Sequence, residues 1–293
     1  MNFAIAKPIN TCGVKSIVKS MIIQEYGKIK WRKTNYKNPM ISKPPKKSLG
    51  QNFLIDEDIL KIFVAAANLN KEDTVIEVGS GTGIVTRELA KIAKKVFAVE
   101  IDQDLLDTLK NNIKTCSNAE IINKDILDVF EKLSTNVSVY KIVGAIPYSI
   151  TSPLLHTLIL AKNAPNSITL ITQEEVAEKI CTKEPKATYL SNFISLYGYS
   201  KIVGRVKPTA FYPSPNVTSA IIHIEKRAVV DSADLLRKKS SFLHKGFSHP
   251  RKMLGNILEK GILLKAGIDP TSRAQELSLD KWEILFNNES GKR

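Results

Sequence analysis

Five short, nearly continuous apolar runs recur between residues 74 and 172, and longer segments of mixed polarity separate them. The runs are TVIEVG (74–79), VFAVEI (96–101), AEIIN (119–123), YKIVGAI (140–146) and SITLIT (167–172). Continuous rather than alternating apolar character is typical of strands that are buried on both faces of a parallel sheet. We therefore expect five parallel strands at the centre of the fold.

Several of the intervening segments place apolar residues at spacings of three and four, which indicates helices. The clearest are TRELAKIAKK (86–95), QDLLDTLKNNIK (103–114) and SPLLHTLILAK (152–162). Two later β-like segments, 193–206 and 217–226, follow without a convincing helix between them, and we expect them to close the sheet as an antiparallel pair. The alternation of strands and helices predicts an α/β, doubly wound, Rossmann-like domain.

After Arg227 only helical character remains, in LLRKKSSFLHKGF (235–247), RKMLGNILEKGILLKAG (251–267) and KWEILF (281–286). These segments predict a small, all-helical C-terminal domain. Residues 1–45 lack regular apolar periodicity and are typical of a flexible extension. We therefore divide the chain into a basic flexible extension (1–45), an α/β domain (46–228) and a helical domain (229–293).

The net charge of the chain indicates the class of its binding partner. The 293 residues include 43 Lys and Arg against 29 Asp and Glu, a net charge of +14 that is typical of nucleic-acid-binding proteins. Residues 1–47 hold 11 of the basic residues and one acid, Glu25, so most of the excess lies in the extension.

Composition also excludes some classes. No apolar run approaches the roughly 18 residues of a membrane span, which excludes an integral membrane protein. The three cysteines, Cys12, Cys116 and Cys181, form neither a disulfide framework nor a zinc motif, which favours a reducing compartment. We expect a cytoplasmic protein, and the basic, acid-poor extension is also compatible with organellar targeting.

The first predicted strand runs into a glycine-rich turn, Gly79-Ser80-Gly81-Thr82-Gly83. Glycines let the backbone approach a ligand closely. Glu100, 21 residues after Gly79, ends the second strand, where a carboxylate can accept both hydroxyls of a ribose. The turn reads GxGxG after the acidic Glu77, which resembles S-adenosylmethionine-dependent methyltransferases and implies that Glu77 and the loop amides hold the amino-acid end of that cofactor.

Asp125 occupies the tip of the third strand, where its carboxylate can accept the exocyclic amine of the cofactor adenine and Ile126 can flank the ring. The fourth strand ends in Ala145-Ile146-Pro147-Tyr148. An apolar-Pro-aromatic turn beside a cofactor offers a flat platform for a flipped base, with backbone carbonyls free to accept its amine. No metal site is expected, since His156, His223, His244 and His249 show no metal-ligand spacing.

Six motifs follow one another in order: GQNFL (50–54), EVGSGTG (77–83), VEID (99–102), KDIL (124–127), IPY (146–148) and FYPSPNVTS (211–219). Over about residues 46–286 the chain resembles the ribosomal RNA adenine N6,N6-dimethyltransferases, the family of the kasugamycin-sensitivity methylase and its Dim-type relatives. The resemblance implies dimethylation of N6 of two adjacent adenines in the 3′-terminal hairpin of small-subunit rRNA, with a role in ribosome assembly. We expect a monomer that acts on the immature 30S particle.

Carried over by motif, the resemblance also assigns residues. It implies that Tyr148 stacks on the target base and that Phe211 closes its other face. The cofactor residues are Gln51, Asn52, Leu54, Glu77, Gly79, Gly81, Glu100, Ile101, Asp125, Ile126 and Ala145, and the target residues are Ala145, Ile146, Pro147, Tyr148 and Phe211. The basic residues predicted to grip RNA are Lys46, Lys47, Arg237, Lys238, Lys239, Lys245, Arg251 and Lys252.

Ala145 departs from the family, whose fourth motif begins with Asn. That amide oxygen accepts the target N6–H, and its loss costs about 1–3 kcal/mol, or about one to two decades in rate. Because the Ile146 and Pro147 carbonyls and the Tyr148 stack remain, we expect an active enzyme of altered efficiency. The alternative is a weak or inactive methylase that serves as a ribosome-binding assembly factor.

Two other interpretations share the motifs. One is the methylase of large-subunit rRNA that confers macrolide resistance, although SLGQNFL (48–54) and the sizeable helical tail favour the small-subunit target. The other is the mitochondrial transcription-factor branch, which binds nucleic acid without a methylase requirement. The intact turn, Glu100 and Asp125 argue against that branch, because a pure binder has no need of a complete cofactor pocket.

Overall fold

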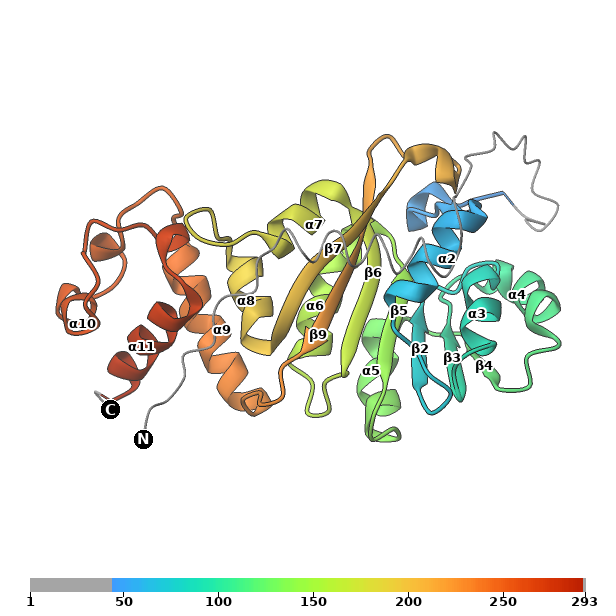
Figure 1. Cartoon of the computed structure of the whole chain (residues 1–293), viewed down its shortest axis with the longest axis horizontal. Helices are drawn as coiled ribbons and strands as arrows, with labels where there is room; N and C mark the ends of the chain where they lie inside the picture. The colour runs from blue at the N-terminus through green and yellow to red at the C-terminus, as the bar shows by residue number, and fades with distance from the viewer. Residues whose placement is uncertain (1–43, 292–293) are drawn as a thin grey trace, which may run out of the picture. The chain divides into compact units, whose positions relative to one another are not determined.

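The computed structural model describes residues 44–291 and has a seven-stranded sheet at its centre (Figure 1). In chain order its strands are β2 (Thr74–Val78), β3 (Lys95–Val99), β4 (Ala119–Ile122), β5 (Lys141–Ala145), β6 (Ser167–Gln173), β7 (Gly198–Val206) and β9 (Ser219–Lys226). Their spatial order is β4-β3-β2-β5-β6-β9-β7, with β9 antiparallel to both neighbours and the other pairs parallel. The predicted doubly wound sheet with an antiparallel closing pair is confirmed.

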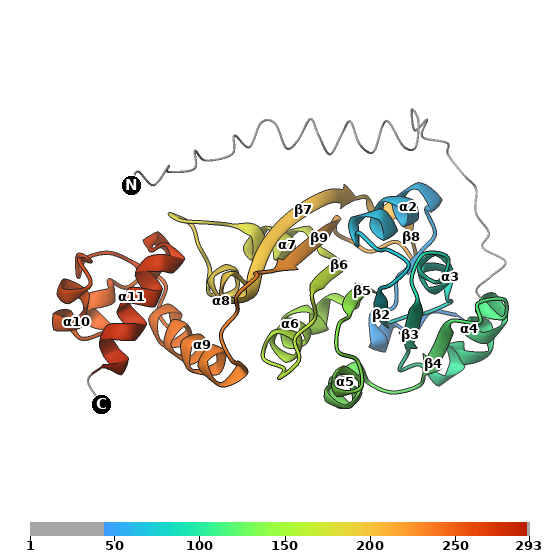
Figure 2. The ribbon, with the colours of Figure 1, turned by 60° about the horizontal axis from the view of Figure 1, so that its bottom comes forward.

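Helices cover both faces of this sheet (Figure 2). They are α2 (Glu57–Ala66), α3 (Ile84–Ala90), α4 (Leu106–Ile113), α5 (Ile126–Thr135), α6 (Thr151–Ile159), α7 (Glu174–Cys181) and α8 (Tyr189–Tyr197). α2 and α3 share one hydrophobic cluster with inward residues such as Val75 and Val143, whereas α5, α6 and α8 share another with Ile76 and Ile142 on the opposite face. Alternate residues of one strand therefore fill two separate cores.

One predicted strand is partly a helix. The segment 193–206 was expected to be β-like throughout, but its first five residues belong to α8 and β7 begins at Gly198. A capping box between Thr188 and Ser191 starts this helix, and Phe193, Ile194 and Tyr197 are buried. The periodicity of a continuous apolar run does not distinguish a buried helix from a buried strand. Here the capping box favours the helix.

The C-terminal part is helical, as predicted, with α9 (Ala233–Phe247), α10 (Lys260–Lys265) and α11 (Leu279–Ser290). The segment 251–267 is less helical than expected: it forms a 3₁₀ turn, Leu254–Asn256, and only then α10. The loop between β9 and α9 contains the predicted boundary at 228/229, which stays a prediction because both sides share one hydrophobic cluster.

The predicted basic extension, residues 1–45, lies outside the described residues except for Pro44 and Pro45. Within residues 44–291, no helix combines the length and the apolar character that crossing a membrane requires.

Candidate active site

A cavity of about 310 Å³ lies at the carboxyl ends of the parallel strands. Its walls come from the segment before α2, from the turns that follow β2, β3, β4 and β5, and from Phe211. The predicted residues on these walls are Gln51, Asn52, Gly79, Gly81, Glu100, Ile101, Asp125, Ile126, Ala145, Ile146, Pro147, Tyr148 and Phe211. The structure therefore brings most of the predicted cofactor and target residues into one cavity.

The glycine-rich turn forms the part of the wall that follows β2. Gly79 and Gly81 have φ angles of 71° and 54°, a region in which L side chains are strained. The N–H groups of Gly79 and Ser80 both donate to the carbonyl of Val99, at 3.0 and 3.1 Å. These bonds tie the turn to the end of β3 and so to the residues that follow it.

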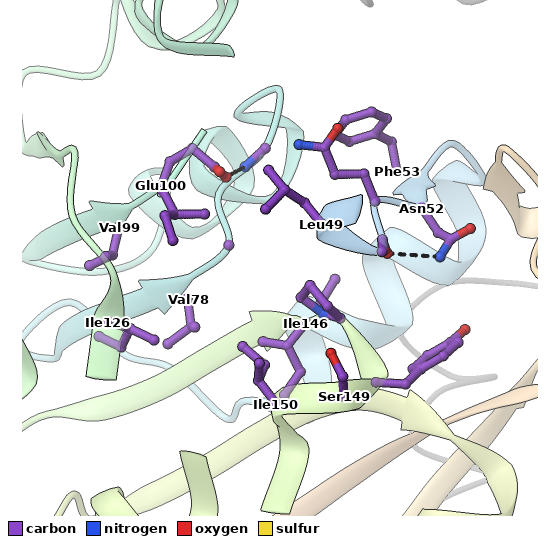
Figure 3. Close-up of a pocket in the computed structure, with 18 of the residues that line it drawn as sticks. Leu49, Asn52, Phe53, Val78, Val99, Glu100, Ile126, Ile146, Ser149 and Ile150 are labelled. Atoms are coloured by element: carbon purple, nitrogen blue, oxygen red, sulfur yellow. Dashed lines mark hydrogen bonds between the residues drawn. The ribbon is translucent and has the colours of Figure 1, made fainter. Parts of the chain in front are cut away.

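Glu100 is 5% exposed and is held by main-chain donors. Gly81 N donates to its Oε2 at 2.7 Å (Figure 3), and Asp102 N donates to its Oε1 at 2.8 Å. Burial raises the pKa of Glu100, and the bonds from these amides oppose that rise. Since a carboxylate oxygen can accept more than one hydrogen bond, each oxygen retains capacity for a ligand hydroxyl.

Asp125 has two roles at the start of α5. Its Oδ1 accepts from Leu127 N at 2.9 Å as the N-cap of the helix, and Oδ2 has no hydrogen-bond partner among residues 44–291. The neighbouring Ile126 is buried and lines the cavity beside it (Figure 3). This pair offers one acceptor and one apolar surface to a planar ring.

Two predicted cofactor residues are not on the walls. Glu77 is 1% exposed, and its Oε2 accepts from Thr86 Oγ1 of α3 at 2.5 Å, so it supports the turn from behind instead of facing the cavity. Burial raises the pKa of Glu77 to about 7 although the Thr86 and Ser80 hydroxyls oppose the shift. Leu54 is buried in the cluster around α2, and Phe53 occupies the wall in its place.

The target side of the cavity combines the end of β5 with a second, two-stranded sheet. Tyr148 shares a hydrogen bond of 2.6 Å with Ser219 Oγ of β9, and burial raises its pKa. Phe211 begins β8 (Phe211–Tyr212), which pairs antiparallel with β1 (Phe53–Leu54). Ala145 contributes a methyl group at the position where the resemblance leads us to expect an asparagine amide.

Sequence reasoning missed part of the wall. The additional residues are Ser48, Leu49, Gly50, Phe53, Val78, Val99, Leu105, Lys124, Ser149, Ile150 and Ile171. Most are apolar, and several face the cavity beside Glu100 and Asn52 (Figure 3). Gly50, Phe53, Val78, Val99 and Lys124 stand inside the six motifs, and membership of a motif was the signal available in the sequence.

The basic residues predicted to grip RNA divide into two groups. Lys47, Lys238, Arg251 and Lys252 are exposed and have no ion-pair partner among residues 44–291. The others are paired: Lys46 with Asp102 and Asp104, Arg237 with Asp234, Lys239 with Asp231 and Glu283, and Lys245 with Glu289.

The prediction that Lys239 grips RNA disagrees most clearly with the structure. Its side chain is 11% exposed, and the carboxylates of Asp231 and Glu283 lie 2.7 and 2.9 Å from its ammonium group. A lysine buried between two acids is not available to a phosphate, so Lys239 holds α9 against α11 instead.

The sheet order and the cavity at its carboxyl edge define the class of Rossmann-like methyltransferases. The family model described as ribosomal RNA adenine dimethylase matches residues 43–288. The chain belongs to this family.

Curated relatives agree with that assignment. The ribosomal RNA small subunit methyltransferase A of Dehalococcoides mccartyi is 39% identical over 257 residues, which cover 82% of this chain and 87% of the relative. The protein of the same name from Clostridium botulinum is 36% identical over 256 residues, covering 82% and 92%.

Solved structures are similar as well. The 23S rRNA methyltransferase ErmE has a TM-score of 0.65 and 26% identity, covering 81% of this chain and 99% of that one. A dimethyladenosine transferase from Plasmodium falciparum has a TM-score of 0.67 at 23% identity, covering 82% and 98%, and supports the fold alone.

Proposed function

We propose that this protein uses S-adenosylmethionine to dimethylate N6 of two adjacent adenines in the 3′-terminal hairpin of small-subunit rRNA. The observation that carries the proposal is that one cavity contains both the glycine turn with Glu100 and Asp125 and the aromatic pair Tyr148 and Phe211. The two relatives described as small-subunit methyltransferases support the choice of target RNA.

The residues present fit the proposed cofactor. Gly79 and Gly81 line the cavity where the amino-acid end would lie, Glu100 retains acceptor capacity for the ribose hydroxyls, and Asp125 Oδ2 has no partner among residues 44–291 and can accept the adenine amine. When bound, the cofactor supplies an electrophilic methyl group on its sulfonium.

The target adenine would leave its helix and stack between Tyr148 and Phe211, at the energetic cost common to base flipping. Its amine then needs acceptors that orient the nitrogen lone pair. The Pro147 carbonyl already accepts from Ile150 N at 3.2 Å, whereas the Ile146 carbonyl has no such partner among residues 44–291. Ile146 O is therefore our candidate acceptor for the N6–H group.

Labelled methyl transfer tests the proposal directly. Immature 30S particles and large-subunit rRNA are each incubated with the wild-type protein and labelled cofactor, and the nucleosides are analysed. We expect N6,N6-dimethyladenosine from the 30S particles. Label in large-subunit rRNA would favour the macrolide-resistance type instead.

Calorimetry separates cofactor binding from RNA methylation. Glu100→Ala removes the proposed ribose acceptor and should weaken cofactor binding strongly, whereas Glu72→Ala, a change at an exposed acid, should not. Wild-type affinity in Glu100→Ala would refute the assignment of this pocket.

Ala145 supports a second candidate function. Without the motif amide, the protein could bind the immature 30S particle as an assembly factor with little methyl transfer. Stable binding to these particles together with absence of the dimethylated nucleoside would favour that role.

A further inference from the structure

We call residues Lys46–Phe53 the strap, and its residues Ser48–Phe53 form one wall of the cavity. Figure 3 shows Leu49 and Phe53 of the strap across the cavity from Ile126. A Cβ atom at Gly50 would lie 3.4 Å from Pro147 Cβ, so the strap also contacts the turn that holds the target residues. A ligand in this cavity would therefore lie against the strap.

Main-chain bonds anchor the far end of the strap. Leu54 pairs with Phe211 in the two-stranded sheet, and Ile55 N donates to Ala210 O at 2.8 Å. At the near end, the main-chain bonds that the structure shows among residues 44–291 stay within the strap, and the 3₁₀ turn Lys47–Leu49 contains no buried residue. Little apolar surface therefore stabilises the near end.

Asp102 supplies the missing anchor from the turn after β3. Its Oδ1 lies 2.6 Å from Lys46 Nζ, and its Oδ2 accepts from Gln51 Nε2 at 2.7 Å. The amide of Gln51 is in turn fixed by Lys46, whose backbone N–H donates to Gln51 Oε1 at 2.7 Å. One carboxylate thus joins two points of the strap, five residues apart, to the body of the protein.

The electrostatics of this contact are favourable. The Asp102 side chain is 3% exposed, and burial opposes its ionisation, but the bonds from Lys46 and Gln51 prevail and hold its pKa below the usual range. The carboxylate is therefore charged at neutral pH, and charge-assisted bonds of this kind are the strong ones. The backbone N–H of Asp102 also donates to Glu100, the proposed ribose acceptor.

We propose that Asp102 is a positioning residue that fastens the strap across the cavity and thereby slows release of the cofactor. The inference rests on the proposed function. It assigns Lys46 to the closure of the pocket, a role that competes with the predicted contact to RNA.

The first test separates cofactor retention from chemistry. In Asp102→Asn, we expect the cofactor KM and the dissociation rate of S-adenosylhomocysteine to rise about tenfold or more, with kcat at saturating cofactor within about twofold of wild type. Asp107→Asn, at an exposed position of α4, removes the same charge and should leave all three values unchanged. An unchanged KM and dissociation rate in Asp102→Asn would overturn the proposal, as would a loss confined to kcat.

A partner variant keeps the test valid if Asp102→Asn fails to fold. Lys46→Met preserves the aliphatic stem and Asp102 itself, and it should raise the cofactor KM in the same direction. Lys46→Met also removes the ion pair with Asp104, but both variants lose the Lys46–Asp102 contact. Because they share this contact, the double variant should be less impaired than the product of the two single effects. Independent, multiplicative effects would show that Lys46 and Asp102 do not act together.

Hydrogen exchange without cofactor tests the strap independently of the proposed function. The amides of Leu49 and Gly50, which donate to Lys46 O and Lys47 O, should exchange faster in Asp102→Asn than in the wild type, with α9 unchanged. Faster exchange in a protein that does not bind S-adenosylmethionine would contradict only the proposed function. Unchanged exchange in a protein that binds S-adenosylmethionine normally would contradict only the proposal that Asp102 fastens the strap.

Discussion

Ala145 is the residue at which catalysis is most open to improvement. It lines the cavity at the end of β5, where an asparagine would add an acceptor for the target N6–H group. We predict that Ala145→Asn raises the methylation rate on immature 30S particles about tenfold or more, equivalent to about 1.4 kcal/mol. Single-turnover kinetics would measure this rate, and cofactor affinity should hardly move. Lower activity would indicate that the turn has repacked around the small side chain.

Glu77 makes folding stability depend on pH. Its folded pKa of about 7 lies above the ordinary value of 4.5, so its contribution is complete below about pH 4.5 and is lost as pH rises through 7. The full effect of this shift is about 3 kcal/mol. We predict that Glu77→Gln, which retains an oxygen for the Thr86 hydroxyl, loses less unfolding free energy than wild type between pH 5 and pH 8. Denaturant titrations at both pH values measure the difference, and parallel profiles would contradict it.

Among the helices, α9 and α11 approach each other closely at Gly246 and Trp282. A Cβ atom at Gly246 would lie 2.3 Å from Cη2 of Trp282, a residue that is 2% exposed. We predict that Gly246→Ala lowers the free energy of unfolding by about 1–3 kcal/mol, the usual cost of overpacking. Thermal or chemical denaturation would measure it.

The control for this change lies in α10. At Gly261 the added methyl group would meet Glu259 Oε1 at 3.4 Å, an ordinary contact, and alanine is the better helix former by about 0.5–1 kcal/mol. Gly261→Ala should therefore leave stability equal or raised. Equal losses in both variants would show that the Trp282 contact is not the cause.

For the whole molecule, we expect RNA affinity to depend on the exposed basic residues that have no ion-pair partner among residues 44–291. We predict that replacing Lys238, Arg251 and Lys252 together by glutamine weakens binding to small-subunit rRNA and makes its salt dependence shallower by up to about three units of logarithmic slope, since each lost phosphate contact removes about 0.9. Binding titrations between low and moderate salt would measure this slope.

Lys239→Gln is the matched comparison for the salt experiment. Since this lysine is buried between two carboxylates, its loss should lower stability and leave the salt slope unchanged. A slope that responds to Lys239 and not to the three exposed residues would reverse our assignment of the RNA-binding surface.

Several features of this protein could be read from local patterns. Apolar runs mark five parallel strands, and the carboxyl ends of parallel strands meet at one edge of a sheet. Gly79, Glu100 and Asp125 therefore had to converge, as the cavity confirms. The motifs that identify the family are also contiguous in sequence, so they needed no tertiary information.

Other features were decided only by the tertiary structure. The direction of Glu77 depends on Thr86 of α3, and the burial of Lys239 depends on Glu283, 44 positions away. Lys46 was predicted to meet RNA, yet it binds Asp102, 56 positions away. The periodicity of apolar residues predicts which residues are buried. Which charged residues pair depends on which distant segments come into contact in the folded chain, and no local sequence pattern predicts those contacts.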